Sequence, residues 1–471
     1  MRRKGAILFI GAFTFFSLFL SSCGEKGEQP QLWVSTNKLE FPSHVNEQSF
    51  TIKNIGGGEL KVEIYSDLPV VITPYRGVLK AGESMVVKVK LQGRRGGAIS
   101  VVADNGDQAT ITVNVEGVIR VLSYHLNLFN GNQLPPAFAH CFESMEMAIE
   151  RVVGQDVDVG DLVEISLYNE SDATQQVRVE VEIPQYAEPA IKTVELPPFR
   201  KEIVGLTPAF NDSIFSVNEQ KPWHIHIKIS KLDGNLIFEK TEEILILSRN
   251  DMMWTCDELG GEWLILAPLI AVFVTPRDKK GLVQDLVNKA AQFAPNTGMI
   301  GYQRKQKKVW DLWPLLWHWE WMEEKEIVAE QAGAIYKALT SMGVKYVNTP
   351  VSFGEGIQRV KFPAETLEDR SGNCIDLSVL FASAFELLDM RPAILIIPGH
   401  AFVGVYSWKD SKEIIPIEAT MIGKSTFREA WDFACKEWND HRNELLIIDI
   451  KKCRQYGITP APNAAPPLIL R

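Results

Sequence analysis

The sequence predicts a multidomain protein in which two all-β sandwiches precede an α+β domain. Three observations predict this arrangement. The chain has 471 residues, which is too long for one hydrophobic core, so several domains are expected. Up to residue 250, short apolar segments are separated by polar turns rich in glycine, asparagine and aspartate. Beyond that point, apolar residues recur at helical spacing.

Residues 31–118 form the first predicted sandwich. Its strands are expected at 32–35, 50–54, 60–65, 85–91, 98–103 and 109–115. Strands that recur roughly every eight to twelve residues without helical periodicity are typical of a β-sandwich. The stretch 51–60, TIKNIGGGEL, resembles the immunoglobulin-like modules common in exported bacterial proteins. We find no catalytic constellation in this region of the sequence.

Residues 119–250 repeat this pattern and are predicted to form a second sandwich. Its strands are expected at 162–168, 176–183, 190–196, 224–230 and 237–247, and the segment 142–152 is compatible with a helix. We interpret both sandwiches as spacers that support the C-terminal domain. The alternative is a carbohydrate-binding or protein-binding role, although the sequence identifies no exposed aromatic platform.

The α+β domain is predicted over residues 251–460, followed by a tail at 461–471. Helical spacing predicts helices at 283–293 and 327–342. Between these helices, five tryptophans occur at positions 310, 313, 317, 319 and 321. We interpret them as a patch packed in the core or between domains, because tryptophan buries a large area. The alternatives are an aromatic wall beside a cleft and a contact with sugar rings or a membrane.

A thiol stands where a helix is predicted to begin. Cys374 follows Ser371-Gly372-Asn373 and opens an apolar run that ends at Asp389 and Pro392. Aspartate tolerates the left-handed backbone of a helix exit, and proline prevents continuation. A thiol in the first turn lies near the positive end of the helix dipole, which favours the nucleophilic thiolate. Asp376, in the same turn, is expected to hydrogen bond or to interact with the dipole rather than to catalyse.

An imidazole and a carboxylate follow on a predicted β-hairpin. Its strands are expected at 400–406 and 414–420. If they pair about a centre at Asp410, His400 lies opposite Thr420, and Glu418 is its diagonal neighbour on the same face. Diagonal neighbours are about 7–8 Å apart, which a Glu side chain can span. A shift of the strand register by one residue would instead place Glu418 on the opposite face of the sheet. The layout suits a base that is oriented by a carboxylate and faces a nucleophile.

These segments resemble the transglutaminase-like superfamily of papain-type thiol enzymes. The matching residues are Gly372-Asn373-Cys374-Ile375-Asp376 before a helix, Pro398-Gly399-His400-Ala401-Phe402 on a strand, and Pro416-Ile417-Glu418-Ala419-Thr420 on the next strand. The family order is Cys, His, Asp. Here Glu418 occupies the third position, and Asp389 replaces the usual glycine at the helix exit. Glutamate is one methylene longer but can play the same orienting part.

The resemblance implies a role for each of four residues. Cys374 would be the nucleophile, His400 the base and Glu418 the orienting carboxylate. Gln358 is a candidate side-chain donor to the oxyanion, with the backbone N–H of Cys374 as the main donor. The alternatives are that Cys374 is an ordinary buried cysteine, His400 a structural histidine and Glu418 a solvated strand residue. Superfamily members without activity also exist, and the fold alone does not distinguish them.

The N-terminus predicts export and a lipid anchor. Arg2-Arg3-Lys4 precedes an apolar run at 5–20, and Leu20-Ser21-Ser22-Cys23 follows. This ending resembles the bacterial lipoprotein cleavage box, which implies a signal peptide at 1–22, an acylated Cys23 (palmitate among the acyl chains) and a tether at 23–30. The alternative is an ordinary signal peptide cleaved nearby. Acyl chains on Cys23 would hold the protein at the cell envelope, on the outer membrane or the cell surface. The sequence predicts no other membrane crossing.

The composition and the motifs of the sequence argue against some classes of partner and cofactor. The formal net charge of −10 argues against sequence-independent binding of nucleic acid, which needs a basic face. The sequence has no HExxH or CxxC motif, so we expect neither a metal nor a cofactor. The four remaining cysteines are Cys141, Cys256, Cys435 and Cys453. Their spacing shows no disulfide framework, and Cys435 and Cys453 are either a disulfide or two independent thiols.

Together these features predict a lipid-anchored, exported cysteine peptidase or amidase that hydrolyses a peptide or protein substrate. One alternative is a transglutaminase that transfers the acyl group of protein glutamine to an amine. The second alternative is a surface scaffold or binding lipoprotein that has the transglutaminase-like fold but no catalytic activity.

Overall fold

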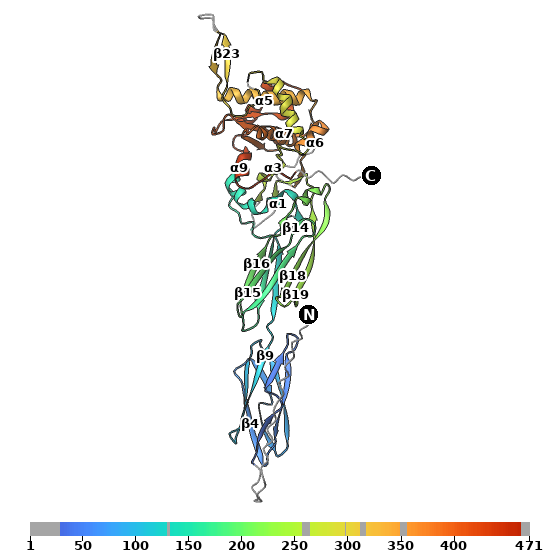
Figure 1. The fold of residues 1–471 in the computed structure, drawn as a ribbon, viewed down its shortest axis with the longest axis vertical. Helices are drawn as coiled ribbons and strands as arrows, with labels where there is room; N and C mark the ends of the chain where they lie inside the picture. Colours follow the sequence, from blue (N-terminus) through green and yellow to red (C-terminus); the bar gives the residue numbers. More distant parts are fainter. Residues whose placement is uncertain are drawn as a thin grey trace, which may run out of the picture. The chain divides into compact units, whose positions relative to one another are not determined.

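The computed structural model describes residues 29–129, 132–256, 264–296, 298–310, 317–348 and 356–462. These residues form two compact units. The first extends to Ile119 and also includes Asn169–Thr174 and Pro197–Arg200, and the second contains the rest of the chain from Arg120 onward. The protein is multidomain and is built mostly of β-strands, with most of its helices in the C-terminal part (Figure 1).

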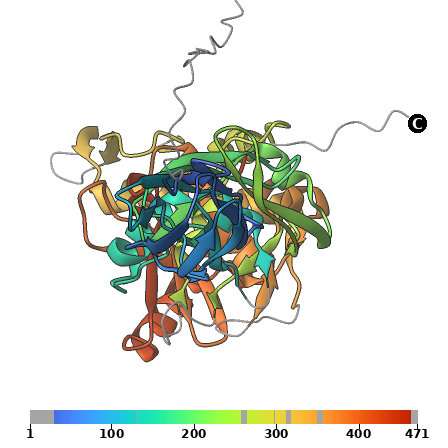
Figure 2. The same cartoon turned by 90° about the horizontal axis from the view of Figure 1, so that it is seen from below.

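The first unit is a β-sandwich. Its strands are β1 (Leu32–Val34), β2 (Lys38–Phe41), β3 (Glu47–Asn54), β4 (Glu59–Tyr65), β5 (Val70–Thr73), β6 (Arg76–Lys80), β7 (Ser84–Leu91), β8 (Gly97–Ala103) and β9 (Gln108–Val115). One sheet has the order β1-β3-β7-β5 and the other β2-β9-β8-β4-β6, both blue in Figures 1 and 2. All the predicted strands are present. The sequence pattern did not predict β2, β5 and β6, which have four or five residues each.

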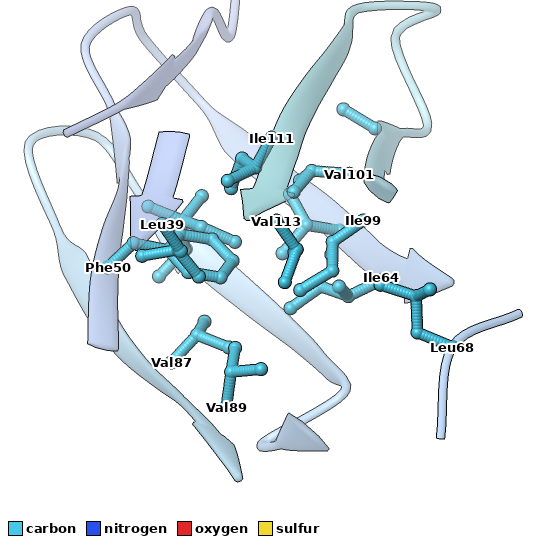
Figure 3. Packing of buried hydrophobic residues seen from close by; sticks show 14 of the residues in the cluster. Leu39, Phe50, Ile64, Leu68, Val87, Val89, Ile99, Val101, Ile111 and Val113 are labelled. Atoms are coloured by element: carbon cyan, nitrogen blue, oxygen red, sulfur yellow. The ribbon is translucent and has the colours of Figure 1, made fainter. Parts of the chain in front are cut away.

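Side chains from both sheets meet in one apolar core. Burial alternates residue by residue along β4, so Leu60, Val62 and Ile64 all point inward. They belong to the same buried cluster as Phe50 and Val87 of the other sheet (Figure 3). Phe50 is only 2% exposed, and its truncation to alanine is expected to cost about 3–5 kcal/mol of stability.

The second unit contains a second sandwich. Its strands are β10 (Ile119–Leu126), β11 (Gln133–Leu134), β12 (Val163–Asn169), β13 (Gln175–Glu182), β14 (Ala187–Glu188), β15 (Ala190–Leu196), β16 (Lys201–Leu206), β17 (Ala209–Phe210), β18 (Lys221–Lys231) and β19 (Leu236–Ile246). The sheets have the orders β10-β12-β16 and β11-β19-β18-β13-β15, and β14 pairs with β17. The five predicted strands are present, whereas β10, β16 and the two-residue strands β11, β14 and β17 were not predicted.

Short helices connect the strands of this sandwich. They are α1 (Pro136–His140), the 3-10 helix η1 (Phe142–Ser144), α2 (Met145–Ala148), the π-helical turn η2 (Ile149–Val153) and the 3-10 helix η3 (Asp212–Ser216). The segment 142–152 is therefore helical, as its composition allowed. Met145, Ala148 and Ile149 are buried along one side of it, which explains the helical spacing of its apolar residues.

The C-terminal part of the second unit combines an antiparallel sheet with helices. Its strands are β20 (Asp251–Met253), β21 (Thr255–Cys256), β22 (Leu264–Ile265), β23 (Gln306–Trp310), β24 (Trp317–Trp321), β25 (Lys345–Tyr346), β26 (Ile357–Arg359), β27 (Ser371–Gly372), β28 (Pro392–Ile397), β29 (His400–Tyr406), β30 (Ile414–Ile417) and β31 (Leu446–Asp449). Its helices are η4 (Ala267–Leu269), α3 (Ile270–Phe273), α4 (Leu282–Ala290), η5 (Ala291–Phe293), α5 (Glu324–Ser341), α6 (Pro363–Asp369), α7 (Cys374–Leu387), η6 (Ala419–Met421), α8 (Phe427–Asp440) and α9 (Ile450–Gln455).

Helix α7 lies at the centre of this region. It packs against β28 and β29 of the four-stranded sheet β30-β29-β28-β31, and α4, α5 and α6 contact its other sides. All residues from Cys374 to Phe385 are buried, as expected for a helix enclosed between a sheet and other helices. The helix ends as predicted, with a left-handed backbone at Asp389 (φ 55°) and Pro392 at the start of β28.

The tryptophan-rich segment forms a hairpin of β23 and β24 that extends away from the rest of the second unit (Figure 1). Trp319 and Trp321 are 64% and 62% exposed. The interpretation of the cluster as a packed patch is therefore wrong for these two side chains. A two-stranded ribbon has no second layer that could cover its faces, so its large side chains stay in solvent. Trp313 lies outside the described residues.

The predictions for both chain ends fall outside the described residues. These are the predicted signal peptide at 1–22, the lipidation site Cys23, the tether up to residue 28 and the tail from residue 463 onward. Among the helices of the described ranges, none is both long and apolar enough to cross a membrane.

Candidate active site

The thiol of Cys374 is held at the first residue of α7 by a local capping arrangement. The Asn373 side chain accepts a hydrogen bond from the Asp376 backbone N–H at 3.0 Å, and the Asp376 carboxylate accepts one from the Asn373 N–H at 2.9 Å. This reciprocal pair satisfies two N–H groups that the helix leaves without acceptors. Cys374 is 2% exposed, and its N–H, the first of the helix, has no acceptor within the helix.

Asp376 also ties this helix start to the segment between β26 and α6. Its other carboxylate oxygen accepts a hydrogen bond from the Lys361 N–H at 2.8 Å. Burial raises the pKa of Asp376, although the N–H groups of Lys361 and Asn373 oppose the rise. Gly372 leaves room for this contact, because a Cβ there would lie 2.7 Å from the Cβ of Asp376. The expected hydrogen-bonding role of Asp376 is confirmed.

His400 is the first residue of β29 and pairs with Ile397 of β28 across a tight turn. Gly399 in that turn has φ 73°, a conformation that suits glycine. The imidazole Nε2 lies 2.7 Å from Oε2 of Glu418. The ring is also stacked on Phe402, with centroids 6.0 Å apart. Because Nε2 is used by Glu418, Nδ1 is the ring nitrogen left for the thiol.

Glu418 follows β30 and is 1% exposed. The hairpin has the predicted register, with Val403 opposite Ile417 and Tyr406 opposite Ile414. However, the predicted second strand at 414–420 ends at Ile417, and the expected pairing of His400 with Thr420 does not form. The reason is that Glu418 Oε1 accepts the N–H of Thr420 at 3.0 Å and thereby caps the 3-10 helix η6. Its other oxygen is left to hold His400.

The electrostatics of His400 differ from those of an ordinary histidine. Burial alone would lower its pKa, but hydrogen bonds and charge interactions with Cys374 and Glu418 outweigh burial and raise the pKa of His400 to about 10. The imidazole is therefore held as an imidazolium between a sulfur and a carboxylate. The three residues predicted as a triad lie together, within reach of one another.

Gln358 lies on β26, 3% exposed. Its Oε1 accepts a hydrogen bond from the indole Nε1 of Trp254 at 2.7 Å, while its buried Nε2 has no hydrogen-bond partner in the described part of the chain. The indole therefore fixes the amide orientation and leaves an NH₂ donor unused. Buried donors are rarely left unpaired, so this NH₂ group is a candidate donor to a substrate, a water molecule or an ion. Sequence reasoning missed Trp254, because no local pattern links it to a residue 104 positions away.

Tyr346, also missed, lies beside the triad. It is the second residue of β25, which runs parallel to β27 with Tyr346 opposite Gly372. Burial raises the pKa of Tyr346, and the charges of Cys374 and Glu418 raise it further, so the phenol lies within electrostatic reach of both. A two-residue strand gives no sequence signal.

Three other cysteines, Cys141, Cys435 and Cys453, are free thiols in different surroundings. Cys141 and Cys453 are buried, and burial raises the pKa of each to about 12, which makes them poor nucleophiles. Cys435 is partly exposed on α8 and is also free, so it forms no disulfide with Cys453. Within the described ranges, no cluster of three or more His, Cys, Asp or Glu residues is placed to hold a metal ion.

Comparisons with known proteins give weak similarities. No known protein family matches the chain, and no curated protein matches it. Similar solved structures include the YadV chaperone, with 13% identity, a TM-score of 0.16 and coverage of 45% of this chain and 99% of that chain. A C. elegans MSP family member, WR4, has 9% identity, a TM-score of 0.17 and coverage of 18% and 97%, respectively. The Pseudomonas aeruginosa CupB2 chaperone has 8% identity, a TM-score of 0.16 and coverage of 45% and 99%. TM-scores this low carry no argument about this chain.

Proposed function

We propose that the protein is an exported thiol hydrolase, a peptidase or amidase, with Cys374 as nucleophile, His400 as base and acid, and Glu418 as orienting carboxylate. The observation that carries this proposal is the continuous contact from thiol to imidazole to carboxylate, with Nε2 of His400 2.7 Å from Glu418. A nucleophile, a base and a group that orients the base are the components of thiol-based acyl transfer.

The first half of the reaction forms an acyl-enzyme. The Cys374 thiolate attacks the amide carbonyl carbon, and the carbonyl oxygen becomes an oxyanion. Two donors suit this oxyanion: the Cys374 N–H, which has no acceptor within its helix, and Gln358 Nε2, which has no partner among the described residues. His400 then gives its proton to the leaving nitrogen, the C–N bond breaks, and a thioester remains.

Water completes the cycle. Neutral His400 takes a proton from a water molecule, whose oxygen attacks the thioester carbon. The C–S bond then breaks, the acid product leaves, and His400 again pairs with the Cys374 thiolate. Glu418 accepts the hydrogen bond from His400 and stabilises each imidazolium that forms. Its two oxygens hold His400 and the N–H of Thr420 at once, which explains how the longer glutamate keeps a fixed position here.

This proposal includes a fold and a location. We propose a transglutaminase-like fold for the C-terminal region, supported by the order of the thiol helix, the histidine strand and the carboxylate in the chain. We also propose anchoring at the cell envelope through a lipid on Cys23, supported by the sequence around that cysteine. The substrate would be a peptide or protein, and nucleic acid would not be a partner.

Alkylation across pH tests the nucleophile. We expect iodoacetamide to modify Cys374 at pH 6–7 faster than Cys435 in the same sample, as followed by peptide mass spectrometry. Cys435 is the internal control, because burial raises its pKa and no histidine activates it. His400→Ala should slow labelling of Cys374 but not that of Cys435. If Cys374 reacts no faster than an ordinary thiol with a pKa of about 8.5, the hydrolase proposal fails.

A further inference from the structure

A lysine and a tyrosine form one edge of the candidate active site. Tyr346 is opposite Gly372, two residues before Cys374, and the Val347 N–H donates to the Gly372 carbonyl at 2.9 Å. Strand β25 also packs against η6, the turn that follows Glu418. The backbone contacts thus place Tyr346 between the thiol helix and the carboxylate.

Lys424 reaches this edge from the turn after η6. Its Nζ lies 5.4 Å from the centroid of the Tyr346 ring, a cation–π distance. The turn itself is held in place, because the Lys424 N–H donates to the Met421 carbonyl at 3.1 Å and the Tyr336 hydroxyl donates to the Ser425 carbonyl at 3.2 Å. A fixed backbone therefore presents an exposed ammonium group beside the site.

The charge of Lys424 is not neutralised in the way of several other lysines in this region. Three of those form ion pairs with carboxylates: Lys280 with Glu368, Lys325 with Glu413 and Lys361 with Asp369. Among the described residues, Lys424 has no such carboxylate and contacts the ring of Tyr346 instead. The ring keeps the ammonium in place while leaving its hydrogen-bond donors available.

We propose that Lys424 and Tyr346 form a subsite that binds a carboxylate of the substrate beside the scissile amide. The expected substrates are peptides that carry an aspartate, a glutamate or a free C-terminal carboxylate next to the cleaved bond. The Lys424 ammonium donates hydrogen bonds to a carboxylate and supplies the opposite charge. The Tyr346 ring holds this ammonium in place, while the Tyr346 hydroxyl donates to Asn348 Oδ1 at 3.3 Å. This inference rests on the proposed hydrolase function, because it places the carboxylate relative to an amide at Cys374.

Alkylation by reagents of different charge tests the subsite without any peptide. Iodoacetate carries a carboxylate and iodoacetamide does not, and both transfer a two-carbon group to the thiol. The ratio of their rates at Cys374 in the purified full-length chain should fall about three- to tenfold in Lys424→Met, as expected for loss of one nearby charge. It should fall further in Lys424→Glu. Comparing ratios between variants cancels the contribution of His400, which all of them retain.

The matched control is Lys345→Met. Lys345 is also exposed and precedes Tyr346 on β25, but successive side chains of a strand point to opposite faces. Its removal should leave the rate ratio unchanged. An equal fall of the rate ratio in Lys345→Met and Lys424→Met would show that the effect comes from general surface charge, and it would overturn the subsite. An unchanged rate ratio in Lys424→Met would also overturn the subsite.

Peptide hydrolysis then identifies the source of the carboxylate. Peptides are compared in pairs: Glu against Gln beside the cleaved bond, and a free C-terminus against a C-terminal amide. A side-chain subsite predicts a preference of about tenfold or more in the first pair, and a terminal-carboxylate subsite predicts it in the second. In either case Lys424→Glu should abolish the preference, and no preference in either pair would refute the inference.

The two proposals fail in distinguishable ways. If Cys374 is activated and peptides are hydrolysed, but Lys424 variants keep the wild-type ratio and preference, the hydrolase stands and the subsite is refuted. If Cys374 reacts like Cys435 and no peptide is hydrolysed, the hydrolase proposal is refuted, and the subsite falls with it.

Discussion

Replacing Glu418 with glutamine tests how the site holds its imidazolium. Glu418 uses one oxygen for His400 and the other for the Thr420 N–H. A glutamine has a single acceptor oxygen for these two donors, so its NH₂ group must face one of them. A charge-assisted hydrogen bond contributes about 1.5–3 kcal/mol, and one pKa unit is about 1.4 kcal/mol. Glu418→Gln should therefore lower the pKa of His400 from about 10 to about 8–9.

The direction of the pH effect follows from this shift. The pKa of His400 is raised above its ordinary value, so the imidazolium contributes stability fully below pH about 6.5, and this contribution is lost as the pH rises through about 10. In Glu418→Gln the loss should be complete one to two pH units lower, by the same estimate of about 1.5–3 kcal/mol. Turnover should fall by up to about 10⁴-fold, because an amide does not stabilise the imidazolium.

The assay combines two pH profiles, of peptide turnover and of the free energy of unfolding in urea, between pH 5 and 10.5. Glu413→Gln is the matched control, since Glu413 lies in the same hairpin and is exposed. Glu418→Asp should keep part of the activity. If Glu418→Gln has the turnover and the alkaline limb of the wild type, Glu418 does not orient His400 and the reasoning is refuted.

Three further predictions address the fold, the anchor and the reaction. Asp376→Ala should lower the free energy of unfolding by about 1–3 kcal/mol, because it leaves the N–H groups of Lys361 and Asn373 without their acceptor. The control Asp432→Ala, at an exposed position, should cost less than about 0.5 kcal/mol. An equal cost in both variants would contradict the capping role. Cys23→Ala should release the protein from membranes and block lipid incorporation, and membrane fractionation that persists after a high-salt wash would count against the anchor. With excess primary amine, mass spectrometry should find more hydrolysed than amine-bearing product, and the reverse ratio would indicate acyl transfer.

Features that depend on neighbouring residues were predictable from the sequence. The start of α7 at Cys374 is set by Asn373 and Asp376, which cap it within one turn. The helix exit at Asp389 and Pro392 follows from backbone preferences of single residues. The register of the β29–β30 hairpin follows from the length of its polar connection. All of these use contacts over a few positions, where local propensity and geometry decide the outcome.

The exposure of side chains required the tertiary structure. Five tryptophans in a short segment indicated packing, yet Trp319 and Trp321 are exposed. Hydrophobic composition states how much area a residue can bury, but only the presence of a second layer decides whether it does. The conversion of the chain after Ile417 into η6 was likewise missed, because it depends on a carboxylate that serves His400 and Thr420 together.

The sequence by itself therefore determined that this protein places a thiol at a helix start, with a histidine and a carboxylate on the following hairpin. The tertiary structure decided which other groups join them. Trp254 reaches Gln358 across 104 residues, and Lys424 reaches Tyr346 across the turn after η6. These contacts depend on the pairing of β20 with β26 and on the packing of β25 against η6. No local propensity encodes such pairings, because their free energy arises from burial and hydrogen bonding between segments that are distant in sequence.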